Sequence, residues 1–258
     1  MRPAVPFLDT HAMEWVPGDM PGLFTKMLSA DPETGARSAL QCIDPARGYK
    51  APALPHYHDG DEEIFIVKGE LTFDGRQWLG ERAYCFHPAR TVHGFRSQVD
   101  SEAWFISRIK RPLKFDFHED AESLEPYSLD GVESERGVAV VPTPAERPWE
   151  DILDAGGKTI ARRQILSVHP GTGEGSMLVE FLPGFVSPHG DHYHSVYEEV
   201  FVVSGQLETA DGKVFTKGCY SYKPPMYVQS AVSSENGAVA YVNFGGKLDF
   251  LPAASKPA

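Results

Sequence analysis

Cysteine, basic charge and long apolar runs are all scarce in this 258-residue sequence. The three cysteines, Cys42, Cys85 and Cys219, lie far apart without Cys-x-x-Cys spacing, which excludes a disulfide framework and favours a reducing compartment. No stretch approaches the roughly 18 consecutive apolar residues of a membrane helix. Residues 1–19 contain no apolar run of signal-peptide length. We therefore expect a cytoplasmic protein with no membrane partner.

The charge balance argues against a nucleic-acid partner. The chain has 24 Lys and Arg against 36 Asp and Glu, a formal net charge of -12. Binding to nucleic acid or to an anionic membrane depends on clustered Lys and Arg side chains. We expect a small-molecule substrate instead. Helix signals are weak, whereas 24 Gly and 21 Pro favour many short strands and turns, so we predict an all-β fold.

The sequence contains two copies of one pattern. Residues 56–71 and 192–207 are identical at nine of sixteen aligned positions, including a His-Tyr-His run and a Glu-Glu pair. The parallel continues at Asp74-Gly75 and Asp211-Gly212, each between short apolar runs, which is typical of a hairpin turn. A repeat of this kind predicts a duplicated β-domain.

The repeat suggests where the domains begin and end. We predict a first domain at residues 1–120, a linker with a short strand at residues 121–147, and a second domain at residues 148–258. The linker prediction depends on an acidic stretch between His118 and Glu135 that contains no Lys or Arg.

The His-Tyr-His run concentrates metal-ligand chemistry. His56 and His58 lie on the same side of a strand, because side chains alternate between faces. A turn at Asp59-Gly60-Asp61 is expected to fold Glu62 back toward the two imidazoles. Two imidazoles and one carboxylate on one wall suit Fe(II), and also Mn, Ni or Zn. His87 lacks ligand spacing and is predicted to be an ordinary histidine.

The repeated pattern of His-x-His, three residues, Glu, six residues and Gly resembles the first motif of the cupin superfamily. The second cupin motif, Pro-x-Gly-x-x-His, is similar to residues 88–93 and, less closely, to residues 224–229. The chain thus resembles a bicupin, in particular small bacterial ChrR-like cupins and cupin dioxygenases. The resemblance implies two tandem cupin barrels (double-stranded β-helix, or jelly-roll). It also implies a homodimer, because cupin barrels commonly pair through an exchanged N-terminal strand.

Carrying the cupin pattern over to this chain implies a metal ligand set in each half. In the first half the set is complete: His56, His58, Glu62 and His93. Four protein ligands on a six-coordinate metal leave two positions for water, substrate or O₂. In the second half the corresponding residues are His192, His194, Glu198 and Gln229. An amide oxygen is a poorer ligand than imidazole, so we expect a weaker or vacant second site, with His189 as a candidate replacement ligand.

Two turn positions depart from the cupin pattern. Arg90 and Met226 stand where Gly is usual, so either the turns differ in shape or Arg90 reaches an anionic substrate. Arg108, on a predicted strand, is a candidate pocket residue or a cross-strand partner. Glu63 and Glu199 alternate away from the ligand face and are predicted to face solvent.

The resemblance implies a metal-dependent enzyme, and first of all a non-haem Fe(II) dioxygenase acting on a small oxygenated organic substrate. Two alternatives stay open: a redox-neutral isomerase or lyase that uses Mn or Zn as a Lewis acid, and a ChrR-like module that senses a ligand or oxidant without catalysis. ChrR-like regulators carry a separate zinc-binding helical domain. The first forty residues here hold no His/Cys cluster, which favours the enzyme.

Overall fold

A computed structural model describes residues 2–52, 54–112, 114–118, 125–130 and 132–256. The described residues form strands and a few 3-10 turns, namely Thr10–Ala12, Pro45–Arg47, Pro144–Glu146 and Ala253–Ser255. None of the helical segments in this part of the chain has the length and hydrophobicity of a membrane span. The prediction of an all-β fold is therefore confirmed.

The strands form two compact units. The first contains Glu14–Glu146, and the second contains Pro3–Met13 together with Arg147–Ala258. The N-terminal strand thus belongs to the second unit, whereas the sequence suggested a first domain at residues 1–120. Within the predicted linker at 121–147, residues 121–124 and 131 lie outside the described residues. The short strand expected there is present, at Ala139–Val141, and it pairs within the first unit.

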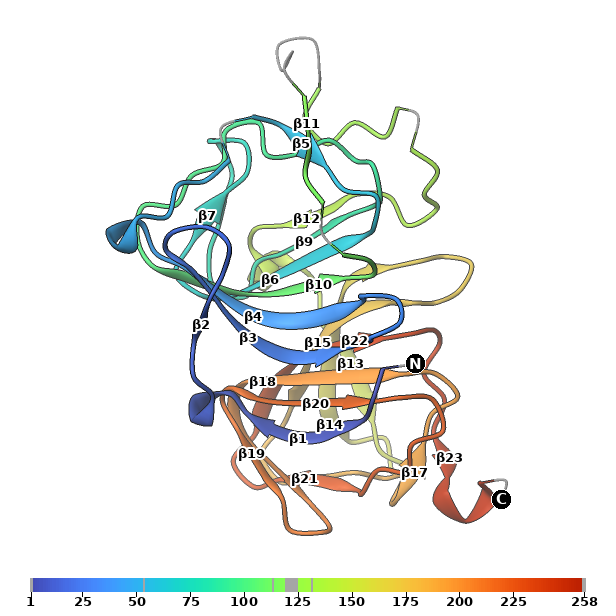
Figure 1. Cartoon of the computed structure of the whole chain (residues 1–258). Helices are drawn as coiled ribbons and strands as arrows, with labels where there is room; N and C mark the ends of the chain where they lie inside the picture. The colour runs from blue at the N-terminus through green and yellow to red at the C-terminus, as the bar shows by residue number, and fades with distance from the viewer. Residues whose placement is uncertain (1, 53, 113, 119–124, 131, 257–258) are drawn as a thin grey trace. The chain divides into compact units, whose positions relative to one another are not determined.

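The first unit is organised around a seven-stranded sheet in the order β12-β9-β6-β10-β4-β3-β2 (Figure 1). Two small two-stranded sheets, β11-β5 and β7-β8, complete it. The strands of this unit are β2 (Val16–Pro17), β3 (Leu23–Ala30), β4 (Arg37–Ile43), β5 (His56–Tyr57), β6 (Glu62–Lys68), β7 (Leu71–Thr72), β8 (Trp78–Leu79), β9 (Tyr84–His87), β10 (Ala103–Ile109), β11 (Asp116–Phe117) and β12 (Ala139–Val141).

The second unit repeats this arrangement in a ten-stranded sheet. Its main path is β1-β20-β18-β22-β15-β14-β13, with β16, β19 and β21 attached beside it and β17 paired with β23. The strands of this unit are β1 (Val5–Asp9), β13 (Glu150–Leu153), β14 (Thr159–Val168), β15 (Gly175–Phe181), β16 (Phe185–Val186), β17 (His192–Tyr193), β18 (Glu198–Thr209), β19 (Val214–Thr216), β20 (Cys219–Lys223), β21 (Val232–Ser234), β22 (Ala238–Phe244) and β23 (Leu251–Pro252).

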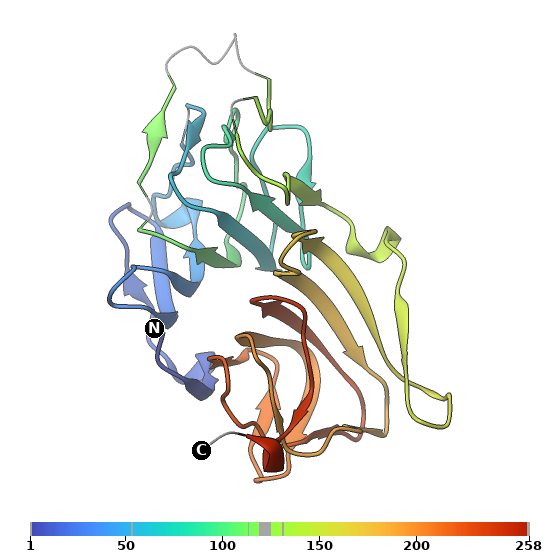
Figure 2. The same ribbon diagram turned by 90° about the vertical axis from the view of Figure 1, so that its right-hand side faces the viewer.

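The main paths of the two sheets correspond strand by strand, as the prediction of two tandem cupin barrels requires. The ligand strand β6 lies between β9 and β10, and its counterpart β18 lies between β20 and β22 (Figure 1). Figure 2 shows the strands of the two units from a second side. The preceding short strand, β5 or β17, in each unit makes an isolated bridge, His56 with His93 and His192 with Gln229. The same backbone framework therefore surrounds both candidate sites.

The ligand strand β6 is buried on both of its faces. On the inner face, Ile64 and Ile66 are 4% and 0% exposed and belong to the apolar core of the first unit. The outer face holds Glu63, which is 2% exposed, as is Glu199 in the second unit. The prediction that these two glutamates face solvent is therefore wrong, although the alternation that directs them away from Glu62 and Glu198 is correct.

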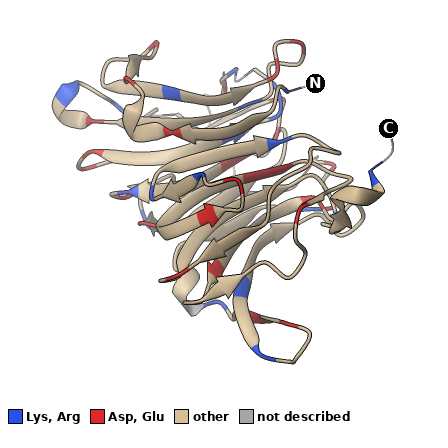
Figure 3. Cartoon of the chain, turned by 90° about the horizontal axis from the view of Figure 1, so that it is seen from below, with Lys and Arg blue, Asp and Glu red and all other residues tan. Residues whose placement is uncertain are grey.

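Burial of Glu63 is made tolerable by cationic partners. Its Oε1 accepts hydrogen bonds from Arg108 Nη1 at 2.8 Å and from Arg136 Nη1 at 3.1 Å, and its Oε2 accepts one from Tyr84 Oη at 2.9 Å. A buried carboxylate is costly unless its charge is compensated in this way. In the ribbon of Figure 3, positions of Lys and Arg and of Asp and Glu are interspersed along strands and loops.

Candidate metal centre

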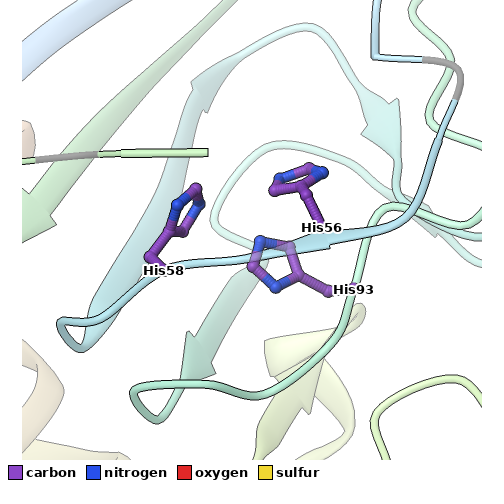
Figure 4. Close-up of side chains that lie close together, drawn as sticks. All are labelled: His56, His58 and His93. Atoms are coloured by element: carbon purple, nitrogen blue, oxygen red, sulfur yellow. The ribbon is translucent and has the colours of Figure 1, made fainter. Parts of the chain in front are cut away.

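Three imidazoles converge in the first unit (Figure 4). His56 lies on β5, His58 follows it on the same side, and His93 faces His56 across the isolated bridge. Their ring centroids are 5.1 Å apart for His56 and His58, 4.5 Å for His56 and His93, and 5.2 Å for His58 and His93. One donor nitrogen from each ring lies within 4.8 Å of the other two.

The backbone fixes this convergence. His56 N donates to His93 O at 2.9 Å, and His93 N donates to His56 O at 2.9 Å, so the two residues are held directly opposite each other. Gly94 leaves room for the His56 ring, because a Cβ at position 94 would lie 2.7 Å from His56 Cε1. Gly94 also has a φ of 77°, a left-handed conformation that disfavours other residues.

Glu62 adds a carboxylate to the imidazoles. Its Oε2 lies 3.5 Å from His93 Nε2 and 3.9 Å from His58 Nε2. Ligand atoms about 2.1 Å from a six-coordinate metal lie about 3 Å apart in neighbouring positions, so these separations need only small adjustments. The turn at residues 59–61 therefore brings Glu62 to His58 of the His-Tyr-His run, and His93 of the second motif approaches the same carboxylate oxygen.

The hydrogen bonds on the outer sides of the rings select one tautomer. The Nδ1 atoms of His56, His58 and His93 lie 3.4, 2.8 and 2.9 Å from the backbone oxygens of Leu54, Lys114 and Thr91. A carbonyl oxygen only accepts, so each Nδ1 carries the proton and each Nε2 carries a lone pair. This is the arrangement that orients a metal-ligating histidine.

The inward nitrogens lack a hydrogen-bond donor. His58 Nε2 and His93 Nε2 are buried and have no hydrogen-bond partner within the described part of the chain. Buried polar atoms are normally paired, so two such lone pairs aimed at one point fit a bound cation. The donor set, imidazole nitrogen and carboxylate oxygen, suits a divalent transition metal.

The surroundings of His56, His93 and Glu62 shift the pKa values of these three side chains in the direction that favours binding of a metal ion. Burial, together with the neighbouring imidazoles, lowers the pKa of His56 and of His93 to about 4. Burial alone would raise the pKa of Glu62, but the adjacent imidazoles of His87, His93 and His58 hold it well below its usual value. Near neutral pH the imidazoles of His56 and His93 are therefore neutral and the Glu62 carboxylate is ionised, which are the protonation states that metal binding requires.

His87 is a member of the cluster that the sequence analysis missed. Its register places it directly opposite Glu62, and its Nδ1 lies 3.6 Å from Glu62 Oε2. Its ring stacks on His93 with a centroid distance of 4.1 Å, and Glu62, His87 and His93 form a second possible donor group. The missing signal was strand pairing, because His87 ends the strand that pairs with the ligand strand, without a recognisable spacing to the other histidines.

The two arginines proposed from the sequence do not line the cavity at this cluster. Arg90 has a side chain that is 72% exposed and lies 3.5 Å from Asp59 Oδ1. Arg108 points to the outer face of β10, where it pairs with Glu63. The assignment of both to the substrate pocket is therefore corrected, and for Arg108 the cross-strand alternative is the one observed.

The turn at Arg90 keeps its shape without glycine. Arg90 and Met226, the residues that replace Gly, have φ values of 69° and 66°. In each unit the turn makes the same backbone hydrogen bonds, including Arg90 N to His58 O at 2.7 Å and Met226 N to His194 O at 2.8 Å. The left-handed conformation that explains the usual Gly is thus retained at both positions.

A cavity of about 380 Å³ adjoins the imidazole cluster. Its apolar lining includes Tyr49, Ile64, Phe73, Phe105 and Phe115. Its polar lining includes Gln41, Ser107 and Arg37 of β4. Within the described part of the chain Arg37 makes no ion pair, and its guanidinium stays charged at neutral pH even though burial lowers its pKa.

The second unit has a different set of side chains in the same place. His192 and His194 have ring centroids 5.1 Å apart, and His194 Nε2 lies 3.8 Å from Glu198 Oε1. Gln229 takes the position of His93. His189 stacks on Phe250 with a centroid distance of 4.1 Å and does not join a donor group. Among the described residues, the groups of three or more close metal-ligand side chains lie in the first unit.

Comparisons with known proteins agree with this architecture. The family model described as the ChrR Cupin-like domain matches residues 5–111 and 138–247, and so covers both repeats. No curated protein is significantly similar in sequence.

Solved structures share the fold at low identity. A putative dioxygenase from Nostoc punctiforme is similar with a TM-score of 0.75 and 20% identity over 93% of this chain and 82% of that one. A salicylate 1,2-dioxygenase from Pseudaminobacter salicylatoxidans has a TM-score of 0.59 and 14% identity over 85% and 75% of the two chains. An oxalate decarboxylase from Lactobacillus farciminis has a TM-score of 0.56 and 12% identity over 96% of this chain and 86% of that one. The family match over both repeats, with the paired barrels, establishes that the chain belongs to the ChrR cupin-like family.

Proposed function

We propose that this protein is a metal-dependent dioxygenase that acts on a small oxygenated organic molecule in the cavity of the first unit. The observation that supports this most directly is the pair of buried, unpartnered Nε2 lone pairs on His58 and His93, beside the Glu62 carboxylate. Similarity of the fold to a putative dioxygenase and to salicylate 1,2-dioxygenase is in keeping with the proposal.

His56, His58, Glu62 and His93 would hold the metal, for which Fe(II) is proposed, with Mn, Ni or Zn as alternatives. When bound, Fe(II) would supply redox chemistry toward O₂ and two coordination positions that protein ligands leave open. The chain's own contribution is orientation: backbone carbonyls fix the three rings, and the paired backbone groups of His56 and His93 fix their separation.

The cavity residues would bind and shield the substrate. Phe73, Phe105 and Phe115 present apolar surface that excludes water from the site. Arg37 is a fixed positive charge in the same cavity, and it would bind an anionic or carbonyl oxygen of the substrate. The substrate class that matches this lining is an apolar molecule with oxygen-bearing groups, such as a diketone, a catechol or a hydroxyketone.

Oxygen uptake by the Fe(II)-loaded protein tests this proposal. Purified protein is offered diketones, catechols and hydroxyketones in turn, and O₂ consumption is followed with an electrode. We expect uptake with at least one class, loss of uptake in His58→Ala, and retention in the matched second-unit variant His194→Ala. Metal-loaded protein that consumes no O₂ with any class would contradict the dioxygenase proposal. Turnover without O₂ would favour a redox-neutral isomerase or lyase.

A homodimer and a cytoplasmic location stay predictions. The N-terminal strand expected to be exchanged between chains is paired with β20 in the second unit of its own chain. Sedimentation analysis of the purified protein would test the dimer, which is expected at about twice the chain mass of 28.5 kDa.

A further inference from the structure

The second unit differs from the first at a position that faces the candidate ligand carboxylate. In the first unit His87 of β9 lies opposite Glu62 of β6. In the second unit Lys223 of β20 lies opposite Glu198 of β18. Since β9 and β20 occupy corresponding places in their sheets, Lys223 stands where His87 stands.

Lys223 brings a positive charge to the centre of this cluster. Its Nζ donates a hydrogen bond to Gln229 Oε1 and lies 3.6 Å from Glu198 Oε2. The two charged side chains are largely buried, 15% exposed for Lys223 and 14% for Glu198. The groups that contact Glu62 in the first unit are imidazoles instead. A buried ammonium that already pairs with the carboxylate both neutralises it and repels a metal cation.

The cavity beside Lys223 is enclosed mainly by apolar side chains. It has a volume of about 230 Å³. Its lining includes Ile160, Met177, Val179, Phe181, Phe185 and Phe215, together with the polar group formed by His192, Glu198, Lys223 and Gln229. A mostly apolar cavity with a few convergent polar groups is the usual form of a small-molecule site.

The polar groups specify the kind of ligand atom that fits. An ammonium has three N–H donors, of which Lys223 donates one to Gln229 Oε1; its 3.6 Å ion pair with Glu198 is longer than a hydrogen bond. Gln229 Nε2 is buried and has no hydrogen-bond partner among the described residues. Two donor atoms, Lys223 Nζ and Gln229 Nε2, therefore have N–H groups available to an oxygen acceptor. Because Glu198 already balances the charge of Lys223, an uncharged carbonyl group fits better than a carboxylate.

We propose that the cavity of the second unit is a metal-independent binding site for a small, uncharged, apolar molecule with one carbonyl group, in which the Lys223 ammonium takes the place of the metal ion. This site goes beyond the proposed dioxygenase reaction and does not depend on it. If the first unit proves to have no dioxygenase activity, the second unit is still expected to bind such a molecule.

Metal content tests the exclusion of metal from the second unit. We expect wild-type protein loaded with Fe(II), Mn(II) or Zn(II) and then desalted to retain at most one ion per chain by elemental analysis. The double variant Lys223→His with Gln229→His restores the side chains of the first unit and is expected to retain one ion more. A second ion in the wild type that is lost in His194→Ala would overturn the proposal, as would a folded double variant that gains none.

Binding of a defined probe tests the ligand class. Acetophenone carries one carbonyl group, and ethylbenzene has a similar size without it. By calorimetry on metal-free protein we expect acetophenone to bind and ethylbenzene to bind at least about tenfold more weakly, since ethylbenzene would leave two hydrogen-bond donors unpaired. Wild-type protein that binds both equally, or neither, would refute the carbonyl assignment.

A matched pair of variants locates the probe. Lys223→Met is expected to weaken acetophenone binding about tenfold or more, because a charged donor is lost. His87→Met, at the corresponding position of the first unit, is expected to leave it within about twofold of wild type. Since Lys223→Met leaves Glu198 uncompensated, Lys223→Met with Glu198→Gln serves as the neutral version, and thermal melting verifies that it is folded. Full-strength binding by that folded double variant would place the probe elsewhere.

Discussion

The two units place one backbone bridge under different side chains. His56 faces His93 in the first, and His192 faces Gln229 in the second, with the same pair of backbone hydrogen bonds in each. The two units therefore share one backbone scaffold. Their sites differ at two positions: the residue opposite the ligand-strand glutamate and the residue opposite the first histidine. A cupin barrel can therefore keep its backbone geometry while the side chains around the ligand-strand glutamate change from imidazoles in the first unit to a lysine and a glutamine in the second.

The most direct way to break this comparison is to remove the same histidine from each unit. His58→Ala is expected to abolish retention of metal by the first unit, because it removes one of four ligands. His194→Ala is expected to leave the metal content unchanged. Elemental analysis of both desalted proteins beside the wild type measures this. If His58→Ala kept the full metal content, the assignment of ligands in the first unit would be wrong.

The outer faces of the ligand strands allow a second comparison, this time of stability. Arg108 pairs with the buried Glu63, whereas the corresponding position in the second unit, opposite Glu199, holds Asn243, whose Nδ2 donates to Ser176 Oγ at 2.7 Å. Arg108→Met is expected to lower the free energy of unfolding by about 3 kcal/mol, because it leaves a buried carboxylate with less compensation.

Asn243→Leu, the matched variant, is expected to cost about 1–2 kcal/mol, since it removes hydrogen bonds that Asn243 donates to the neutral hydroxyl oxygens of Ser176 and Tyr241. Urea unfolding of both variants measures the difference. Equal losses would show that the charge of the Glu63 network does not dominate its energetics.

A third comparison concerns the room left for His56. In Gly94→Ala the new Cβ would lie 2.7 Å from the His56 ring, in a backbone with φ of 77°. We expect a loss of about 1–3 kcal/mol in stability, from the strained backbone, together with weaker metal binding as the ring is displaced. Gly80→Ala is the control, because a Cβ there meets nothing within 4 Å. Thermal melting and metal titration of both variants provide the measurement, and a normal metal affinity in Gly94→Ala would contradict the packing argument.

The smallest expected effect concerns the two turns in which Gly is replaced. Arg90→Gly and Met226→Gly each relieve a left-handed backbone, but glycine also makes the unfolded chain more flexible. These contributions nearly cancel, so we expect each variant to change stability by less than about 1 kcal/mol. The two changes should also be similar, because the turns make equivalent hydrogen bonds. Unequal shifts in melting temperature would show that one of the turns is held by its side chain.

The sequence was informative where the pattern was local or repeated. The duplicated His-Tyr-His run and the period-2 alternation predicted the paired β-units and the direction of Glu62. The same alternation separated Glu63 from Glu62, but alternation does not tell whether the second face of a sheet is covered. The burial of Glu63 depends on Arg136, which follows it by 73 residues, and no local pattern indicates that contact.

Residues brought to the site by strand pairing were not predictable in this way. His87 and Lys223 each lie opposite the ligand glutamate because of the register between neighbouring strands. Neither residue has a distinctive spacing to the cupin motif. The arginine in the cavity was not predictable either. Arg90 and Arg108 lie near or after the cupin motifs but do not line the cavity, whereas Arg37, which does, comes from a strand that precedes both motifs.

The pairing of β1 with β20 has a consequence for the order in which the chain becomes folded. Thr10 donates its hydroxyl hydrogen to the backbone oxygen of Gly218, a contact across 208 residues. During synthesis β1 leaves the ribosome well before its partner β20, because 208 residues separate Thr10 from Gly218. The first unit can thus assemble while β1 stays unpaired, and the edge of the second sheet closes only after β20 has been synthesised.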